Sequence, residues 1–414
     1  MFFRYLVKRG VAKIFENSDV AVKILFSDGS VYVNHPSKDG DIYDVTVHFK
    51  HPKAERWFAL MGGVGFGEAY HQGLIDVNEN DLEALIDVVR SKFISIQKPP
   101  LLVRIRRFVY EWRVNNKDIS QAKRNAIFHY NYPAEFYRLI QGDTYGYVEG
   151  YWQTGHETLD QSMHNRFDYM CRKLHLKPGL KVAEVGSGWG YMTNLMARDY
   201  GVTVDTYGIV EGQNKTLLAM ASQWGVQDKV TLLEEDHRNL KQRPCTYDRY
   251  VSLGVFEHAG KDCQEDWMDS IATSLKEGGI GLLSVMTYSS ERYTDFMTTK
   301  YIFPGGNIPS IGKVIDMLEA RGLYVLDLEN ARHHYALAAQ EWKKNFQKNW
   351  SKIQALNPEL FNERFRRTWF LYLMGAGTAF ESPQSNLSIQ QIVFSKGRKH
   401  TYPTTRDFLY CPTR

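Results

Sequence analysis

Long apolar runs, paired cysteines and a strong net charge are all missing from this sequence of 414 residues. No stretch approaches the 18 apolar residues of a membrane-spanning helix, and the residues from Met1 to Arg4 open no signal peptide. The four cysteines show no paired spacing, which argues against disulfides and metal ligands. Because the net charge is only +4, attraction to anionic partners must come from local clusters. We expect a soluble cytoplasmic protein with no metal and no nucleic-acid partner.

The composition is that of a globular protein, with 43% apolar and 24% charged residues. Aromatic residues, at 14%, are abundant and suit a deep apolar pocket. A chain of this length can bury a large core and is expected to carry more than one domain. We predict a small α+β domain over 1–98, a basic helical and aromatic-loop region over 99–158, a main α/β domain over 159–398, and a tail over 399–414 that looks disordered.

In the first of these regions, Val20–Phe26 and Val31–Val33 read as a hairpin. The glycine-rich segment Gly62–Tyr70 follows no long strand and is interpreted as a structural turn. Asp81–Phe93 has helical spacing of its apolar residues.

Residues 101–128 form a basic amphipathic helical stretch that includes Arg104, Arg106 and Arg107. Such a segment can lie on an anionic membrane surface. A helix packed on the protein with a solvated charged face is an equal alternative.

A glycine turn organises the main domain. Lys181–Val185 is a short apolar strand containing Glu184, and it is followed by Gly186, Gly188 and Gly190 and then by a helical pattern. A strand, glycine turn and helix in this order indicate a nucleotide-binding unit. The pattern Glu-x-Gly-x-Gly-x-Gly is typical of S-adenosylmethionine-dependent methyltransferases. A dinucleotide fingerprint would need a third glycine at Tyr191, although Asp205 keeps the NAD alternative open.

Alternating strands and helices continue from about residue 160, which predicts a doubly wound, mostly parallel sheet. Ligands bind beyond the carboxyl ends of such strands, where the glycine turn, Asp236, Phe256–His258 and Ser284–Met286 should converge. The insertion 287–312 is placed to cover that site.

With these pieces in place, residues 125–396 resemble the cyclopropane-fatty-acid synthase family, which includes the mycolic acid cyclopropane synthases. The matching motifs are His129-Tyr130-Asn131, Tyr151-Trp152, Glu184–Gly190, Gly254–Gly260, Lys300–Gly306 and Glu363-Arg364-Phe365. The resemblance implies a Rossmann-like class I methyltransferase with a seven-stranded sheet, a helical lipid-site insertion and S-adenosylmethionine as cofactor. It implies cofactor contacts from a set of ten residues: His129, Tyr130, Glu184, Gly186, Gly188, Trp189, Ile209, Gln213, Asp236 and His237.

The family's reaction places a methyl group on an acyl-chain double bond and leaves a carbocation that must lose a proton. Family enzymes hold bicarbonate as the base with a Cys, a Glu, a His and a Tyr. The resemblance gives Glu257 and Tyr335 for two of these, but Glu149 stands in place of the Cys and Ser284 in place of the His. Two anions at contact distance repel each other. We therefore doubt bicarbonate binding and predict that Glu149 is the base.

The resulting hypothesis is a lipid C-methyltransferase acting on a phospholipid acyl chain at the inner face of the membrane. The product is a methyl- or methylene-branched unsaturated chain or a cyclopropane. A small-amine N-methyltransferase and a silenced cofactor- or lipid-binding module are the rival hypotheses. The sequence leaves open a homodimer and a reductase partner.

Overall fold

The predicted glycine turn, Gly186–Gly190, joins strand β5 (Lys181–Val185) to helix α9 (Tyr191–Asp199) in the computed structural model, which describes residues 2–16, 18–35, 43–93, 99–383 and 385–410. Gly190 has a φ of 89°, and a Cβ atom there would lie 2.7 Å from the Cα of Leu217. Only glycine combines that left-handed conformation with so close an approach. The turn therefore brings the start of α9 against the next helix.

The chain forms two units. The smaller unit contains residues 1–113, 295–301 and 350–385, and the larger unit contains 114–294, 302–349 and 386–414. The smaller unit thus includes two segments that the predicted boundaries assigned to the main domain. Within the described residues, no helix is long and apolar enough to cross a membrane.

A seven-stranded sheet in the order β10-β11-β9-β8-β5-β6-β7 is the centre of the larger unit. Its strands, besides β5, are β6 (Thr203–Tyr207), β7 (Val230–Leu233), β8 (Tyr247–Leu253), β9 (Leu275–Tyr288), β10 (Leu323–Asn330) and β11 (Leu387–Lys396). The pairs from β7 to β9 are parallel, and β11 runs antiparallel to both β9 and β10. The order reverses beside β5, so a crevice forms at its carboxyl end. The prediction of a mostly parallel α/β sheet is confirmed.

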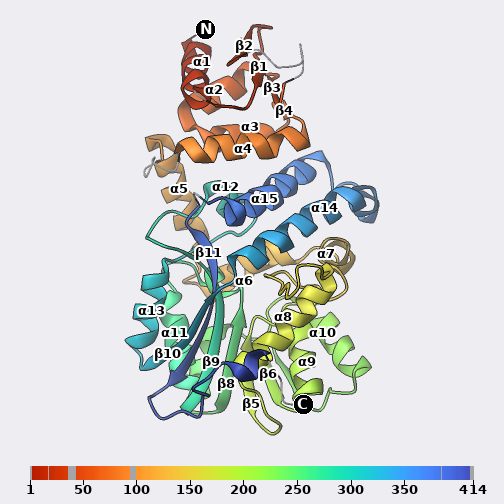
Figure 1. Cartoon of the computed structure of the whole chain (residues 1–414), viewed down its shortest axis with the longest axis vertical. Helices are drawn as coiled ribbons and strands as arrows, with labels where there is room; N and C mark the ends of the chain where they lie inside the picture. The colour runs from red at the N-terminus through yellow and green to blue at the C-terminus, as the bar shows by residue number, and fades with distance from the viewer. Residues whose placement is uncertain (1, 17, 36–42, 94–98, 384, 411–414) are drawn as a thin grey trace. The chain divides into compact units, whose positions relative to one another are not determined.

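Helices cover both faces of this sheet (Figure 1). On one side lie α8 (Leu159–Lys173), α9 and α10 (Glu211–Gln223), and on the other lie α11 (Gln264–Ser274) and α13 (Ile311–Glu319). The remaining elements of this unit are α6 (Ile119–Tyr130), α7 (Ala134–Gln141), the short 3-10 helices η1 (His237–Gln242) and η2 (Phe256–Ala259), the first part of α14 (Arg332–Leu356), and α16 (Asp407–Tyr410).

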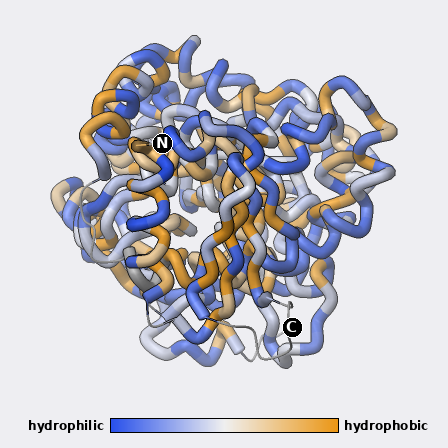
Figure 2. Tube along the Cα trace, turned by 90° about the horizontal axis from the view of Figure 1, so that it is seen from above, coloured by the Kyte–Doolittle hydropathy of each residue, from blue (hydrophilic) through white to orange (hydrophobic). Residues whose placement is uncertain are grey.

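The core of the larger unit lies between the sheet and its helices. Tyr250, Leu283 and Phe394 from the strands pack with Met268 of α11 and Leu318 of α13, and all five are fully buried. Hydrophobic stretches accordingly run along the central strands in Figure 2. Because strands buried on both faces read as continuous apolar runs, these strands were recognisable in the sequence.

The smaller unit contains a four-stranded sheet in the order β2-β1-β3-β4. Its elements are α1 (Phe2–Phe15), β1 (Val22–Leu25), β2 (Val31–Val33), β3 (Val45–Phe49), α2 (Pro52–Met61), α3 (Gly63–His71), β4 (Ile75–Val77), α4 (Glu79–Phe93), α5 (Leu101–Val114), α12 (Phe296–Tyr301) and α15 (Glu363–Glu381). The predicted hairpin is confirmed as the antiparallel pair β1–β2.

One interpretation of this unit was wrong, and the membrane contact expected of Arg107 is excluded by its burial. The glycine-rich segment is helix α3 and not a turn. Its glycines serve packing, because a Cβ atom at Gly65 would overlap the carbonyl oxygen of Trp57. The basic stretch is divided into α5 and α6, and Arg107 of α5 is buried, where it pairs with Glu111 and lies over the ring of Phe296. Arg107 is therefore not available to a membrane surface.

The tail is also more ordered than predicted. Leu409 in α16 is buried, and the side chain of Arg172 in α8 donates a hydrogen bond to its carbonyl oxygen. His175 packs against Phe408. The last turn of the chain that is described therefore closes over the end of α8.

Candidate active site

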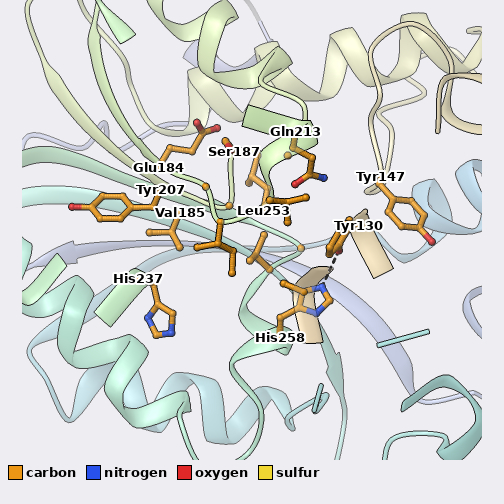
Figure 3. Close-up of a pocket in the computed structure, with 18 of the residues that line it drawn as sticks. Tyr130, Tyr147, Glu184, Val185, Ser187, Tyr207, Gln213, His237, Leu253 and His258 are labelled. Atoms are coloured by element: carbon orange, nitrogen blue, oxygen red, sulfur yellow. Dashed lines mark hydrogen bonds between the residues drawn. The ribbon is translucent and has the colours of Figure 1, made fainter. Parts of the chain in front are cut away.

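A cavity of about 200 Å³ lies beyond the carboxyl ends of β5, β6 and β8 in the larger unit. Figure 3 shows Tyr130 and His258 on one side of it, with Glu184 and Tyr207 on the other. The hydroxyl of Tyr130 lies 2.9 Å from Nε2 of His258. Burial lowers the pKa of His258 to about 4, so this imidazole is neutral at physiological pH.

Nine of the ten predicted cofactor residues line this cavity: Tyr130, Glu184, Gly186, Gly188, Trp189, Ile209, Gln213, Asp236 and His237. The tenth, His129, is not among the lining residues; it is buried and its ring stacks on that of Tyr147 at 5.6 Å. The structure therefore brings residues from four separate segments to one cavity. Their contact with a cofactor remains a prediction.

Glu184 is held by two hydroxyl groups. Thr193 at the start of α9 and Thr206 on β6 both donate hydrogen bonds to Oε2 of its carboxylate, the second at 2.7 Å. Burial raises the pKa of Glu184 to about 7, and these two hydrogen bonds oppose the shift. The carboxyl group thereby ties the strand before the glycine turn to the helix after it.

The next two strand ends, after β6 and β7, also contribute to the lining. A Cβ atom at Gly208 would lie 2.4 Å from the side-chain oxygen of Asn214, so a larger residue there would require Asn214 to move. Asp236 follows β7 and is bound by Arg238 at 2.6 Å. Burial opposes ionisation of Asp236, but the hydrogen bonds from Arg238 prevail and lower its pKa. An anionic acceptor is thus present beside the cavity at neutral pH.

The NAD alternative fits this geometry poorly. Asp205 is not among the lining residues; instead it accepts a hydrogen bond from Tyr247 at 2.9 Å and pairs with Lys181 at 2.9 Å. A Cβ atom at Gly188 would meet no protein atom within 4 Å, so the turn leaves open space beside its backbone. S-adenosylmethionine needs such close backbone contact but no pyrophosphate cradle.

A second polar group of residues lies next to the cavity, around Glu149. Its Oε1 accepts hydrogen bonds from Ser284 Oγ at 2.9 Å, from Gln391 Nε2 at 3.0 Å and from Arg166 Nη2 at 3.2 Å, and its Oε2 lies 3.3 Å from the same Arg166 nitrogen. Glu149 and Arg166 are both fully buried. Burial lowers the pKa of the Arg166 guanidinium, and the Glu149 charge opposes that shift. The structure therefore joins two of the predicted catalytic residues, Glu149 and Ser284, in one site.

Glu257 in η2 accepts a hydrogen bond from the backbone N–H of Met286 through Oε1, whereas its Oε2 is buried with no hydrogen-bond partner among the described residues. Burial, with a smaller contribution from the charge of Glu149, raises the pKa of Glu257 to about 7, and backbone hydrogen bonds oppose the shift. Tyr335 is buried and packs edge-on against Trp342.

Sequence reasoning missed two members of this site. Arg166 lies in α8, 17 positions after Glu149, and Gln391 lies on the last strand. Neither belongs to a recognisable motif. The available signal was charge, because a buried carboxylate requires a nearby cation. Arg166 is the arginine of α8 whose neighbours Met163, Phe167 and Met170 are apolar.

Fold and cavity together define a class I S-adenosylmethionine-dependent methyltransferase. The model of the family described as "Mycolic acid cyclopropane synthetase" matches residues 117–392, and the chain belongs to that family.

Known relatives agree with this assignment. The chain is 32% identical over 292 residues to a "Probable fatty acid methyltransferase" of Pseudomonas putida, covering 68% of this chain and 72% of that protein. It is 27% identical over 352 residues to the cyclopropane-fatty-acyl-phospholipid synthase of Escherichia coli K12, covering 85% and 88% respectively. The solved structure of mycolic acid cyclopropane synthase CmaA1, complexed with SAH and CTAB, aligns with a TM-score of 0.60 and 25% identity over 66% of this chain and 98% of that one. The protein is thus a cyclopropane-fatty-acyl-phospholipid-synthase-like methyltransferase.

Proposed function

We propose that this enzyme methylates the double bond of an unsaturated fatty acyl chain in a phospholipid and that Glu149 is the base. The single observation that supports this most is the buried Glu149 carboxylate, held by Ser284, Gln391 and Arg166. The substrate class follows the names of the two relatives, one a fatty acid methyltransferase and one a phospholipid synthase.

The chemistry requires a base but not a strong one. The bound cofactor supplies an electrophilic methyl group, and its transfer leaves a positive charge on the acyl chain. A carbocation next to C–H bonds is a very strong acid, so a carboxylate suffices to take its proton. Glu149 supplies that carboxylate from the chain itself, where the resemblance implied bicarbonate.

Charge balance supports a fixed carboxylate over a bound bicarbonate. Arg166 supplies one buried positive charge, and Glu149 already neutralises it. A second anion would lie beside Glu149 and near Glu257 in a poorly solvated site, where repulsion is strong. Glu257, with its raised pKa, is partly protonated at neutral pH and can donate a hydrogen bond in that form.

The position of the base decides which proton leaves. Loss of a proton from the added methyl group gives a cyclopropane, and loss from a neighbouring chain carbon gives a methyl- or methylene-branched alkene. Because Glu149 is fixed by three side chains, it cannot move to each proton in turn, and we favour the branched product. A cyclopropane is the alternative, and a small-amine N-methyltransferase, which needs no base for a carbocation, is the second alternative.

The test is to incubate methyl-labelled S-adenosylmethionine with vesicles of an unsaturated phospholipid and to resolve the products by mass spectrometry. Glu149→Gln should lower turnover by up to about 10²-fold and reduce the branched fraction of the product. Glu55→Gln is the matched control, because Glu55 is also buried and paired with an arginine, Arg4, but lies in the smaller unit. Unchanged products in Glu149→Gln, or wild-type activity that rises with added bicarbonate, would refute the role of Glu149. Methylation of small amines but not of lipid would refute the substrate class.

We further propose that the enzyme docks on the membrane through α5. Leu101, Ile105, Phe108 and Trp112 are more than half exposed and recur at a spacing that places them on one helical face. Arg104 and Arg113 are exposed on the same helix. Exposed aromatic and aliphatic residues next to arginines are the features of a helix that lies in the interface of an anionic bilayer.

A further inference from the structure

Arg166 has hydrogen-bonding capacity that the protein does not use. Its Nη2 binds Glu149, but its Nε and Nη1 are buried without a hydrogen-bond partner among the described residues. The same residue lines the cofactor cavity and is fully buried. Leaving a charged donor unsatisfied in the interior costs free energy, so these N–H groups are expected to meet a ligand or a water molecule.

The other cationic or potentially cationic residues that line the cavity are unsuited to bind an anion. Arg238 uses Nε and Nη2 on Asp236 and donates from Nη1 to the carbonyl oxygens of Asn116 and Lys117. His237 and His258 have pKa values lowered to about 4 by burial, so they are neutral at physiological pH. Within the described lining, Arg166 is therefore the positive charge with N–H groups to spare.

S-adenosylmethionine contains one anionic group, the carboxylate of its amino acid part. We propose that Arg166 binds this carboxylate through Nε–H and Nη1–H while Nη2–H continues to hold Glu149. The planar guanidinium suits this double role, because its five N–H donors point in fixed and different directions. Arg166 is then a cofactor-binding residue that also positions Glu149. Unlike bicarbonate, the cofactor carboxylate is accompanied by the positive α-ammonium group of the same molecule, so the site gains no net negative charge.

The experiment measures binding and not turnover. Two probes are compared by calorimetry: S-adenosylhomocysteine, and its decarboxylated analogue, which keeps the amine and lacks the carboxylate. The reference protein is Glu149→Gln, and the test variant is Glu149→Gln/Arg166→Met. The two proteins differ only in the Arg166 guanidinium, and both lack the Glu149 carboxylate. The test variant therefore contains no buried Glu149 carboxylate without a compensating cation.

Loss of Arg166 should weaken S-adenosylhomocysteine binding by about tenfold to a hundredfold, the usual effect of losing a hydrogen bond to a charged group. The decarboxylated analogue should bind both proteins equally, which also reports that the cavity is intact. Equal losses for both probes, or no loss for either, would overturn the proposal.

Arg166→Lys is the second variant if the double variant does not fold. It keeps a positive charge beside Glu149 but replaces the planar guanidinium, whose fixed donors can hold a carboxylate through two parallel hydrogen bonds, by a compact ammonium group without that geometry. The same selective loss of S-adenosylhomocysteine is expected there, and an unselective loss would refute the role of Arg166.

Discussion

Gly188 offers a direct test of where the cofactor lies. Its φ is 51°, and a Cβ atom built on it would meet no protein atom within 4 Å. Its neighbours in the turn differ, because a Cβ at Gly186 would collide with Val255 and one at Gly190 with Leu217. Of the three, Gly188 is the position where a methyl group would enter the cavity without disturbing the protein around it.

Two effects of Gly188→Ala can be separated by magnitude. A left-handed conformation costs an alanine about 1–2 kcal/mol, which should lower the free energy of unfolding by that amount. A methyl group forced against a bound ligand costs about 1–3 kcal/mol, which corresponds to a loss of roughly 5- to 150-fold in affinity. The first effect appears without ligand, and the second appears only with it.

Gly322→Ala is the matched control. Gly322 has a φ of 67°, and a Cβ there would also meet nothing within 4 Å, but it follows α13 and does not line the cavity. Both variants should lose similar stability in urea unfolding, whereas only Gly188→Ala should lose affinity for S-adenosylhomocysteine in calorimetry. Equal affinities of the two variants would show that the ligand does not approach Gly188.

Two further predictions concern the membrane and pH. Phe108→Ser and Arg104→Glu should each reduce flotation with anionic phospholipid vesicles, and the effect of Arg104→Glu should be clearest at low salt. Leu218→Ser, which alters an exposed residue of α10, should leave flotation unchanged. Vesicle binding that is unaffected by both α5 variants and by salt would exclude this docking face. The pKa of Glu184 is about 7 in the folded protein and 4.5 ordinarily, so the folded state holds its proton more tightly, and the stability from this group is lost as pH rises from about 4.5 through 7. Glu184→Gln should therefore make the free energy of unfolding, measured with urea, decline less steeply with pH over that range, by at most about 1.4 kcal/mol per pH unit. An unchanged slope in this variant would contradict the raised pKa of Glu184.

Much of the fold was predictable because its signals are local. Each buried parallel strand is a short apolar run, and the turn after β5 is recognisable by its three glycines within five residues. The segment at Gly65 was misread because helix α3 contains glycines for a reason that only the fold reveals: Gly65 lies against the carbonyl of Trp57 in α2. Composition alone favours a turn there, and packing between helices prevails over it.

Part of the site was predictable for a similar reason. Residues at strand ends of a doubly wound sheet converge wherever they lie in the chain, so the glycine turn and Asp236 could be placed together from their positions after β5 and β7. Gln213 was assigned to the cofactor only by the family resemblance. His129 lies in the last turn of α6, outside this scheme, and the structure buries it against Tyr147 and not in the lining.

The environment of Glu149 was not predictable, because it depends on a charge that no motif marks. From the sequence, replacing a Cys by Glu149 and a His by Ser284 adds a negative charge and removes a hydrogen-bonding group that can become positive. A site altered in that way alone would carry an uncompensated buried anion, which costs several kcal/mol. Arg166 compensates the buried negative charge by pairing with Glu149. Ser284, at the position where the family has a His, donates a hydrogen bond to Glu149 at 2.9 Å. Glu149, Ser284 and Arg166 are therefore best regarded as one electrostatic unit: the carboxylate can be built into the enzyme only because the cation and the small hydroxyl are built in with it.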